Sequence, residues 1–126
     1  MEIIISNAKN QPIYEQIYEQ IKEEVLTGTL KEDQALPSIR TLAKDLKISV
    51  ITTKRAYDDL ERDGFIYTIP SKGSYVKGAN LDFIKEEYLR LMEESLSQAK
   101  DQAKFAGLDK DQALEAFKFI WEEEND

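Results

Sequence analysis

The sequence has no cysteine and no histidine among its 126 residues. These absences exclude disulfides, catalysis by a thiolate or an imidazole, and the usual zinc sites. Carboxylates and lysines can still transfer protons, but no convergent pair of them stands out, so we expect no enzyme, cofactor or metal site. Long apolar runs are also missing, since none approaches the ~20 residues that cross a bilayer. Residues 1–5 lack the basic start of a signal peptide, and we therefore expect a cytoplasmic protein with no membrane partner.

Basic residues are outnumbered, and the formal net charge is −8. Residues 1–80 contain 11 Lys and Arg against 12 Asp and Glu, whereas residues 81–126 contain 6 against 13. Residues 38–57 reverse the balance, because Asp45 is their only acid. The basic residues of this segment are Arg40, Lys44, Lys47, Lys54 and Arg55. A basic surface is the electrostatic mark of a nucleic-acid-binding protein, and here it is confined to one segment.

Hydrophobic periodicity and helix caps predict three helices followed by a hairpin. The first helix is expected over residues 12–27, where proline suits the first turn and isoleucine recurs every fourth residue. A short second helix is expected over 38–46 and a third over 49–63, each starting with a serine that can act as its cap. Residues 65–78 are rich in β-branched and aromatic residues around a Pro-Ser-Lys-Gly turn, which predicts a β-hairpin. This order is the plan of a winged helix-turn-helix.

The last third of the chain predicts two further helices. The first is long, begins at Asn80 or Asp82 and ends near Phe105. The second begins at Asp109, which has capping-box spacing to Gln112. Both carry an apolar stripe at helical period.

These elements predict an α+β, mostly helical fold. A winged helix-turn-helix domain is expected over residues 1–79, and a two-helix dimerisation appendage over residues 80–126. In a helix-turn-helix, the second helix of the pair enters the major groove by its N-terminal end. Here that is the third helix of the chain.

Several residues have types suited to DNA. At the start of the third helix, hydroxyls and an ammonium group can bind phosphates or base edges: Ser49, Thr52, Thr53 and Lys54. Val50 or Ile51 either touches a thymine methyl group or closes the core. Arg40 can reach a phosphate or a guanine, and Lys72 and Gly73 at the hairpin tip can lie over a minor groove. The alternatives are a simple helix cap, solvated charges and an ordinary hairpin turn.

Residues 36–76 resemble the DNA-binding domain of GntR-family bacterial transcription regulators. They begin with Leu-Pro-Ser-Ile-Arg-Thr-Leu-Ala, continue through Ala-Tyr-Asp-Asp-Leu-Glu-Arg-Asp-Gly-Phe-Ile, and end with Gly-Ser-Tyr-Val. Residues 12–30 are similar to the first helix of that family. The resemblance implies a winged helix-turn-helix and a set of DNA-contacting positions. These are Ser38, Arg40, Ser49, Val50, Thr52, Lys54, Lys72 and Gly73.

Two positions depart from the family pattern. Val50 stands where many members have an arginine that can read guanine, and losing a bidentate base contact removes about 1–3 kcal/mol of discrimination. Glu32 and Asp33 stand where Pro-Gly is usual, but aspartate tolerates positive φ, so the turn can persist. We therefore expect the operator to be read more by Arg40, Lys54 and groove shape.

The short helical C-terminal part resembles that of the YtrA subfamily. Two helices alone enclose little of a cavity, so we expect their apolar stripes to form a homodimer interface. The predicted interface residues are Tyr88, Leu91, Met92, Phe117, Ile120 and Trp121. The alternative is that these stripes pack only on the winged helix of their own chain.

The resemblance implies a homodimeric repressor that binds a double-stranded, pseudo-palindromic operator, with an unknown small-molecule effector as a further partner. One rival is a protein-binding winged-helix module without nucleic acid, which the net acidity favours and the basic segment 38–57 opposes. A second rival is a small-molecule-binding enzyme, which needs convergent reactive groups that the sequence does not offer.

Overall fold

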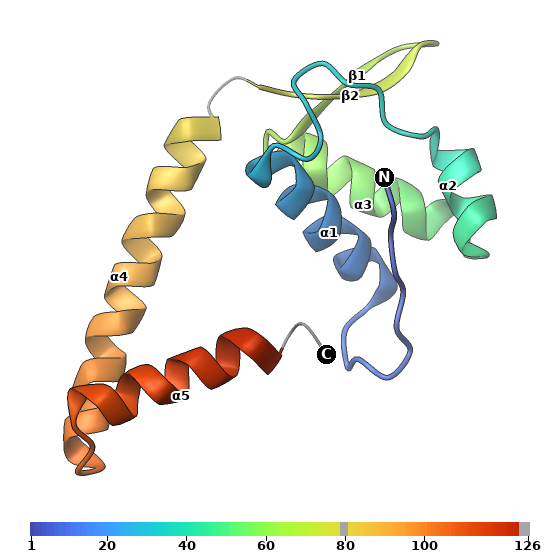
Figure 1. Ribbon diagram of the computed structural model, residues 1–126. Coiled ribbons are helices and arrows are strands. Elements are labelled where there is room, and N and C mark those ends of the chain that lie inside the picture. Colours follow the sequence, from blue (N-terminus) through green and yellow to red (C-terminus); the bar gives the residue numbers. More distant parts are fainter. Residues whose placement is uncertain (79–80, 124–126) are drawn as a thin grey trace. The chain divides into compact units, whose positions relative to one another are not determined.

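The contacts within the chain divide it into two units, which are described separately. The structure, a computed structural model, describes residues 1–78 and 81–123 (Figure 1). The first unit is Met1–Asp82 and the second is Phe83–Asp126. The predicted domain boundary and the predicted cap Asn80 fall outside the described residues. Over the described ranges, no helix combines the length and the apolar character needed to span a membrane.

Helix α1 (Ile13–Thr27) supplies one face of the core of the first unit. Its buried residues are Gln16, Ile17, Ile21 and Val25. Pro12 precedes the helix, and Gly28 ends it with a φ of 81°, donating its N–H to the carbonyl of Val25. This left-handed conformation is open to glycine because it has no Cβ. The helix predicted over residues 12–27 is confirmed and begins one residue later.

Two glutamines of α1 hold the segment that precedes the helix. The amide of Gln20 accepts a hydrogen bond from the Ile4 N–H at 2.9 Å and donates one to the Ile4 carbonyl at 2.7 Å. The buried amide of Gln16 pairs with Ser6 in the same way, at 2.9 and 3.0 Å, and also donates to the Gln11 carbonyl at 2.9 Å. Each side-chain amide therefore pairs with the backbone of one residue in the way that a neighbouring β-strand would. Nothing in the sequence pattern predicted this arrangement.

Helices α2 (Ile39–Leu46) and α3 (Val50–Arg62) form the helix-turn-helix, and both predicted helices are confirmed. Lys47 lies between them with a φ of 57° and makes the turn tight. Helix α3 packs against both α1 and α2. It buries Thr53, Ala56, Tyr57 and Leu60. The Tyr57 hydroxyl donates to the Pro37 carbonyl at 2.7 Å, and burial raises the pKa of this phenol, which keeps it protonated.

The predicted hairpin is formed by strands β1 (Ile66–Ile69) and β2 (Gly73–Val76). They are antiparallel, with Ile66 opposite Val76, and both of these side chains are buried. Since α3 contacts β1, the hairpin is anchored at its base to the helix-turn-helix. The tip projects beyond the helices, and its free end lies on the same side of the first unit as α2 (Figure 1).

A short segment before α2 adds a third partner to the hairpin. The Leu36 N–H donates to the Ser74 carbonyl at 2.9 Å, and the Val76 N–H donates to the Gln34 carbonyl at 2.9 Å. Asp33 has a φ of 65° and donates its N–H to the Val76 carbonyl at 2.8 Å. The turn expected at this position therefore persists with an aspartate in place of glycine. The pairing with β2 was not predicted.

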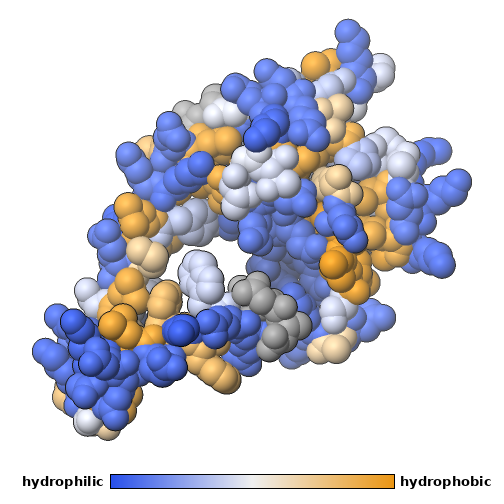
Figure 2. All heavy atoms as spheres, viewed as in Figure 1, coloured by the Kyte–Doolittle hydropathy of each residue, from blue (hydrophilic) through white to orange (hydrophobic). Residues whose placement is uncertain are grey.

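The second unit contains α4 (Leu81–Phe105) from Phe83 onward and the whole of α5 (Lys110–Glu123). Gly107, with a φ of 77°, lies between them. The predicted capping box is confirmed: the Gln112 N–H donates to Asp109 Oδ1, and the Asp109 N–H donates to Gln112 Oε1, both at 2.9 Å. Neither helix buries a residue within its described length. Figure 2 shows hydrophobic side chains exposed among hydrophilic ones along both helices.

Candidate nucleic-acid interface

The N-terminal end of α3 is organised by the hydroxyl of Ser49. This hydroxyl accepts a hydrogen bond from the Thr52 N–H at 3.0 Å and donates to Thr52 Oγ1 at 2.7 Å. The cap stabilises the helix by about 0.5–2 kcal/mol. Because the Thr52 oxygen accepts this bond, its own hydrogen can be donated to a phosphate. The helix end adds its partial positive charge.

Helix α2 begins in the same way. The Ser38 hydroxyl accepts from the Thr41 N–H at 3.0 Å and donates to Thr41 Oγ1 at 2.8 Å. Arg40, the second residue of this helix, is exposed. Thr41 was not among the predicted residues, although the Ser-x-x-Thr spacing that begins both helices could have indicated it. The two helices of the helix-turn-helix therefore present matched hydroxyl pairs.

Lys54 is exposed, and it has an ion-pair partner within the protein. Its ammonium group forms an ion pair with Asp58, one turn later on α3, at 2.7 Å between Nζ and Oδ2. An exposed pair at this spacing contributes only about 0.3–0.5 kcal/mol. A phosphate can therefore compete for Lys54 at small cost.

The structure corrects the expectation for Thr53. This residue is fully buried, and its hydroxyl donates to the Ser49 carbonyl at 3.1 Å. Its side chain fills the core of the first unit and has no surface to offer DNA. Neither Val50 nor Ile51 closes the core, since they are 47% and 82% exposed. The alternative that one of them is a core residue is therefore wrong.

The backbone at the hairpin tip forms a tight turn. Ser71 and Gly73 have φ values of 68° and 107°, and the Lys72 N–H donates to the Ile69 carbonyl at 2.9 Å. The Tyr75 hydroxyl donates to the Lys72 carbonyl at 3.0 Å, so a side chain set back from the tip fixes the turn. The Lys72 side chain is exposed.

Two tyrosines pack against each other behind the tip of the hairpin. The rings of Tyr67 and Tyr75 stack at 5.6 Å between centroids. The Tyr67 hydroxyl donates to Asp33 Oδ1 at 2.8 Å, and this hydrogen bond raises the pKa of the phenol. The acid that replaces the usual turn glycine is thereby tied to the hairpin.

Charge on α3 changes sign along the helix. Lys54 and Arg55 lie in its N-terminal half, and the guanidinium of Arg55 covers the ring of Tyr14 at 3.7 Å. Acidic residues follow in its C-terminal half: Asp58, Asp59 and Glu61. The N-terminal half of α3 is therefore the part of this helix that would attract an anion such as a phosphate.

The predicted dimer residues all lie on the surface of the second unit. They range from 41% exposed for Leu91 to 68% for Trp121. The rings of Phe117 and Trp121 contact each other at 5.9 Å between centroids. Large apolar side chains this exposed along two helices mark a candidate interaction surface.

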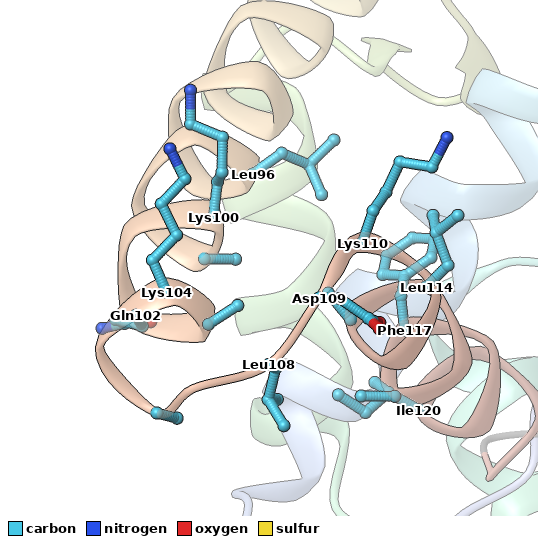
Figure 3. Close-up of a pocket in the computed structure, with 15 residues that line it drawn as sticks. Leu96, Lys100, Gln102, Lys104, Leu108, Asp109, Lys110, Leu114, Phe117 and Ile120 are labelled. Carbon is cyan, nitrogen blue, oxygen red and sulfur yellow. The ribbon is translucent and has the colours of Figure 1, made fainter.

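A hollow of about 870 Å³ lies between α4 and α5. Leu96 extends from α4, and Leu114 and Phe117 extend from α5, toward this space (Figure 3). Three lysines also line it: Lys100, Lys104 and Lys110. The hollow is therefore apolar with positive charge close by.

Comparison with known proteins identifies the family of this chain. The family described as bacterial regulatory proteins, gntR family, matches residues 13–76. The chain is 35% identical over 94% of its length to the HTH-type transcriptional repressor YtrA of Bacillus subtilis, of which it covers 91%. The chain belongs to the GntR family. It is therefore a DNA-binding transcriptional regulator, and the relatives it matches are named as regulators rather than enzymes.

Solved structures agree with GntR membership. A transcriptional regulator from Oenococcus oeni superposes with a TM-score of 0.70 at 30% identity, covering 93% of this chain and 97% of that one. The DNA-binding domain of AraR in complex with operator ORX1 superposes with a TM-score of 0.53 at 25% identity, over 60% of this chain and 95% of that one. The first of these likenesses extends over the helical C-terminal part, and the second covers a smaller share of the chain.

Proposed function

We propose that the chain is a cytoplasmic, homodimeric repressor that binds a pseudo-palindromic operator. Two copies would place two α3 helices in successive major grooves, ~34–36 Å apart. Occupancy of a promoter by such a dimer blocks transcription. The observation that carries the proposal is the pair of matched helix starts on α2 and α3, with exposed cations beside them.

The proposed DNA contacts come from three places in the first unit. The start of α2 contributes Ser38 and Arg40. The start of α3 contributes Ser49, Val50, Thr52 and Lys54. The hairpin tip contributes Lys72 and Gly73. Phosphate contacts from these groups supply affinity that falls with salt.

The proposed dimer forms through the second unit. Its helices expose large apolar side chains and have no buried residue within their described lengths. Burying such side chains contributes about 1.5–3 kcal/mol each when the burial is complete. We assign the interface to Tyr88, Leu91, Met92, Phe117, Ile120 and Trp121.

The hollow between α4 and α5 is our candidate effector site. Its apolar wall and its lysines suit a small molecule with an apolar body and a negative charge. Phe117 and Ile120 line the hollow and also belong to the proposed dimer interface. A ligand there would favour one arrangement of the two copies over another, which is the condition for changing operator affinity.

Footprinting of the full chain on the DNA upstream of its own gene tests the proposal. We expect two protected half-sites with their centres one helical turn apart, and a dissociation constant that rises steeply with salt. Arg40→Ala should weaken binding to that site by about 5- to 150-fold, the loss that corresponds to about 1–3 kcal/mol for a base contact.

Arg62→Ala is the matched control. It removes the same kind of side chain from the C-terminal end of α3, away from the proposed contacts, where Arg62 is paired with Asp59 at 3.0 Å. We expect it to change operator affinity by less than about threefold, as for a surface residue away from the interface. Equal effects of the two variants, with equal salt slopes, would contradict the placement of α2 on DNA.

A further inference from the structure

We propose that Ile51 is a specificity-determining residue that packs against the 5-methyl group of a thymine in each operator half-site. This inference rests on the proposed function, because it requires α3 to lie in the major groove. It adds a base preference at a position that neither the family likeness nor the charge pattern assigns.

The exposure of Ile51 is the first observation. At 82%, it is the most exposed large hydrophobic side chain in the described part of the first unit. Two isoleucines of α1 show the contrast, since Ile17 and Ile21 are completely buried. An isolated aliphatic side chain held this far into solvent gains free energy from any apolar partner that covers it.

The direction of the side chain is the second observation. Successive residues of a helix are rotated by about 100°. The buried side of α3 is defined by Thr53, Ala56, Tyr57 and Leu60. Ile51 lies opposite that side, between the angular positions of Lys54 and Arg55 and almost in line with Asp58. Val50 lies closer to the buried side and is correspondingly less exposed, at 47%.

The neighbours of Ile51 identify the chemistry of its partner. The Thr52 hydroxyl and the Lys54 ammonium group are polar donors that suit phosphates and base edges. A branched aliphatic chain can neither donate nor accept a hydrogen bond, so it cannot read the donor and acceptor pattern of the groove. The thymine methyl is the one apolar group that the major-groove edge of an unmodified base pair presents. Ile51 therefore selects thymine.

The experiment uses the full chain and a random library of 30-base-pair duplexes. The duplexes enriched by binding are sequenced, and each thymine of the resulting site is replaced in turn by deoxyuridine. This replacement removes one methyl group and keeps the base pairing. We expect one position in each half-site at which it weakens wild-type binding three- to fivefold, as expected for one buried methyl group.

Two variants assign the contact. Ile51→Ala should be insensitive to deoxyuridine at that position and should keep the sensitivity of wild type at every other thymine. Val50→Ala shortens the neighbouring aliphatic side chain, which is itself among the proposed DNA contacts. Whatever it does to the overall affinity, it should keep the ratio of thymine to deoxyuridine affinity at that position. Because both residues are exposed, both variants should retain the unfolding midpoint of wild type.

Three results would overturn the inference alone, while enrichment of a discrete site leaves the proposed function standing. The first is that no thymine is sensitive to replacement by deoxyuridine. The second is that Val50→Ala, rather than Ile51→Ala, removes the sensitivity. The third is that Ile51→Ala changes only the oligomeric state measured by sedimentation, which would identify Ile51 as a contact between copies. Failure to enrich any duplex would instead overturn the proposed use of α3, and the inference with it.

Discussion

The polar side chains at the start of α3 have partners within the protein, and DNA would have to compete with some of these partners. Ser49 is bonded to Thr52, and Lys54 is paired with Asp58. Binding to DNA therefore competes with existing interactions, and the net gain in binding free energy depends on how weakly the partner within the protein is held. The Ser49 cap can remain intact, because its Thr52 partner still has a hydrogen to donate. The Lys54 ion pair has to open or be shared, which makes Asp58 the residue that opposes binding.

Replacing this acid gives a prediction at the scale of one residue. Asp58→Asn releases Lys54 and removes a negative charge from the exposed side of α3. Operator affinity at low salt should rise about twofold from the release, since the pair contributes about 0.3–0.5 kcal/mol, and further from the lost repulsion between Asp58 and the phosphates. The gain should shrink as salt increases, since it is electrostatic. Fluorescence anisotropy with the footprinted operator, at several salt concentrations, measures it.

Asp59→Asn is the control for that change. It removes the same charge one residue later, from a carboxylate that is bonded to Arg62 rather than to Lys54. We expect a smaller gain in affinity from this variant. If both variants raise affinity equally, net charge rather than release of Lys54 is responsible.

At the scale of elements, local patterns predicted the helices and the hairpin correctly. Serine caps, glycine ends and apolar periodicity act within a few residues, so they are readable in the sequence. The burial of Thr53 was readable too, because it continues the stripe of Ala56, Tyr57 and Leu60. The pairing of Gln34 and Leu36 with β2 was not, since it joins residues about 40 positions apart. The same holds for Gln20 and Gln16 of α1, whose hydrogen bonds reach back 16 and 10 positions to Ile4 and Ser6.

Those glutamines give a prediction at this scale. Gln16 is buried and makes three hydrogen bonds to the backbone of the preceding segment. Gln16→Ala leaves those backbone groups without their partner, so the free energy of unfolding should fall by about 2–3 kcal/mol. Urea denaturation of the full chain, followed by circular dichroism at one fixed protein concentration, measures the change.

Glu19→Ala provides the comparison on the same helix. Glu19 is exposed, and its removal should change the free energy of unfolding by less than about 0.5 kcal/mol. A Gln16→Ala variant as stable as Glu19→Ala would mean that the N-terminal segment contributes little to the fold.

For the whole molecule, charge and apolar surface are divided between the two units. Residues 1–80 are nearly neutral, with 11 basic and 12 acidic residues, and carry the basic helix starts; residues 81–126 contain 6 basic and 13 acidic residues. Two acidic appendages would repel each other, so the proposed association would have to come from the apolar side chains of α4 and α5. Salt should therefore strengthen the dimer while it weakens the DNA contacts. At a physiological salt concentration, the proposed dimer and its DNA contacts would both have to be stable.

The dimer gives the prediction at this scale. Leu91→Glu places a charge within the proposed interface, where burying it unpaired is costly, so the dissociation constant of the dimer should rise at least 10-fold. Ser97→Glu adds the same charge to the opposite side of α4 and should sediment as wild type does. Sedimentation equilibrium separates the two variants. The Leu91→Glu monomer should still bind an isolated half-site with the affinity of one wild-type winged helix, but should lose the added affinity for the complete operator. A variant that remains dimeric would show that the two copies meet elsewhere.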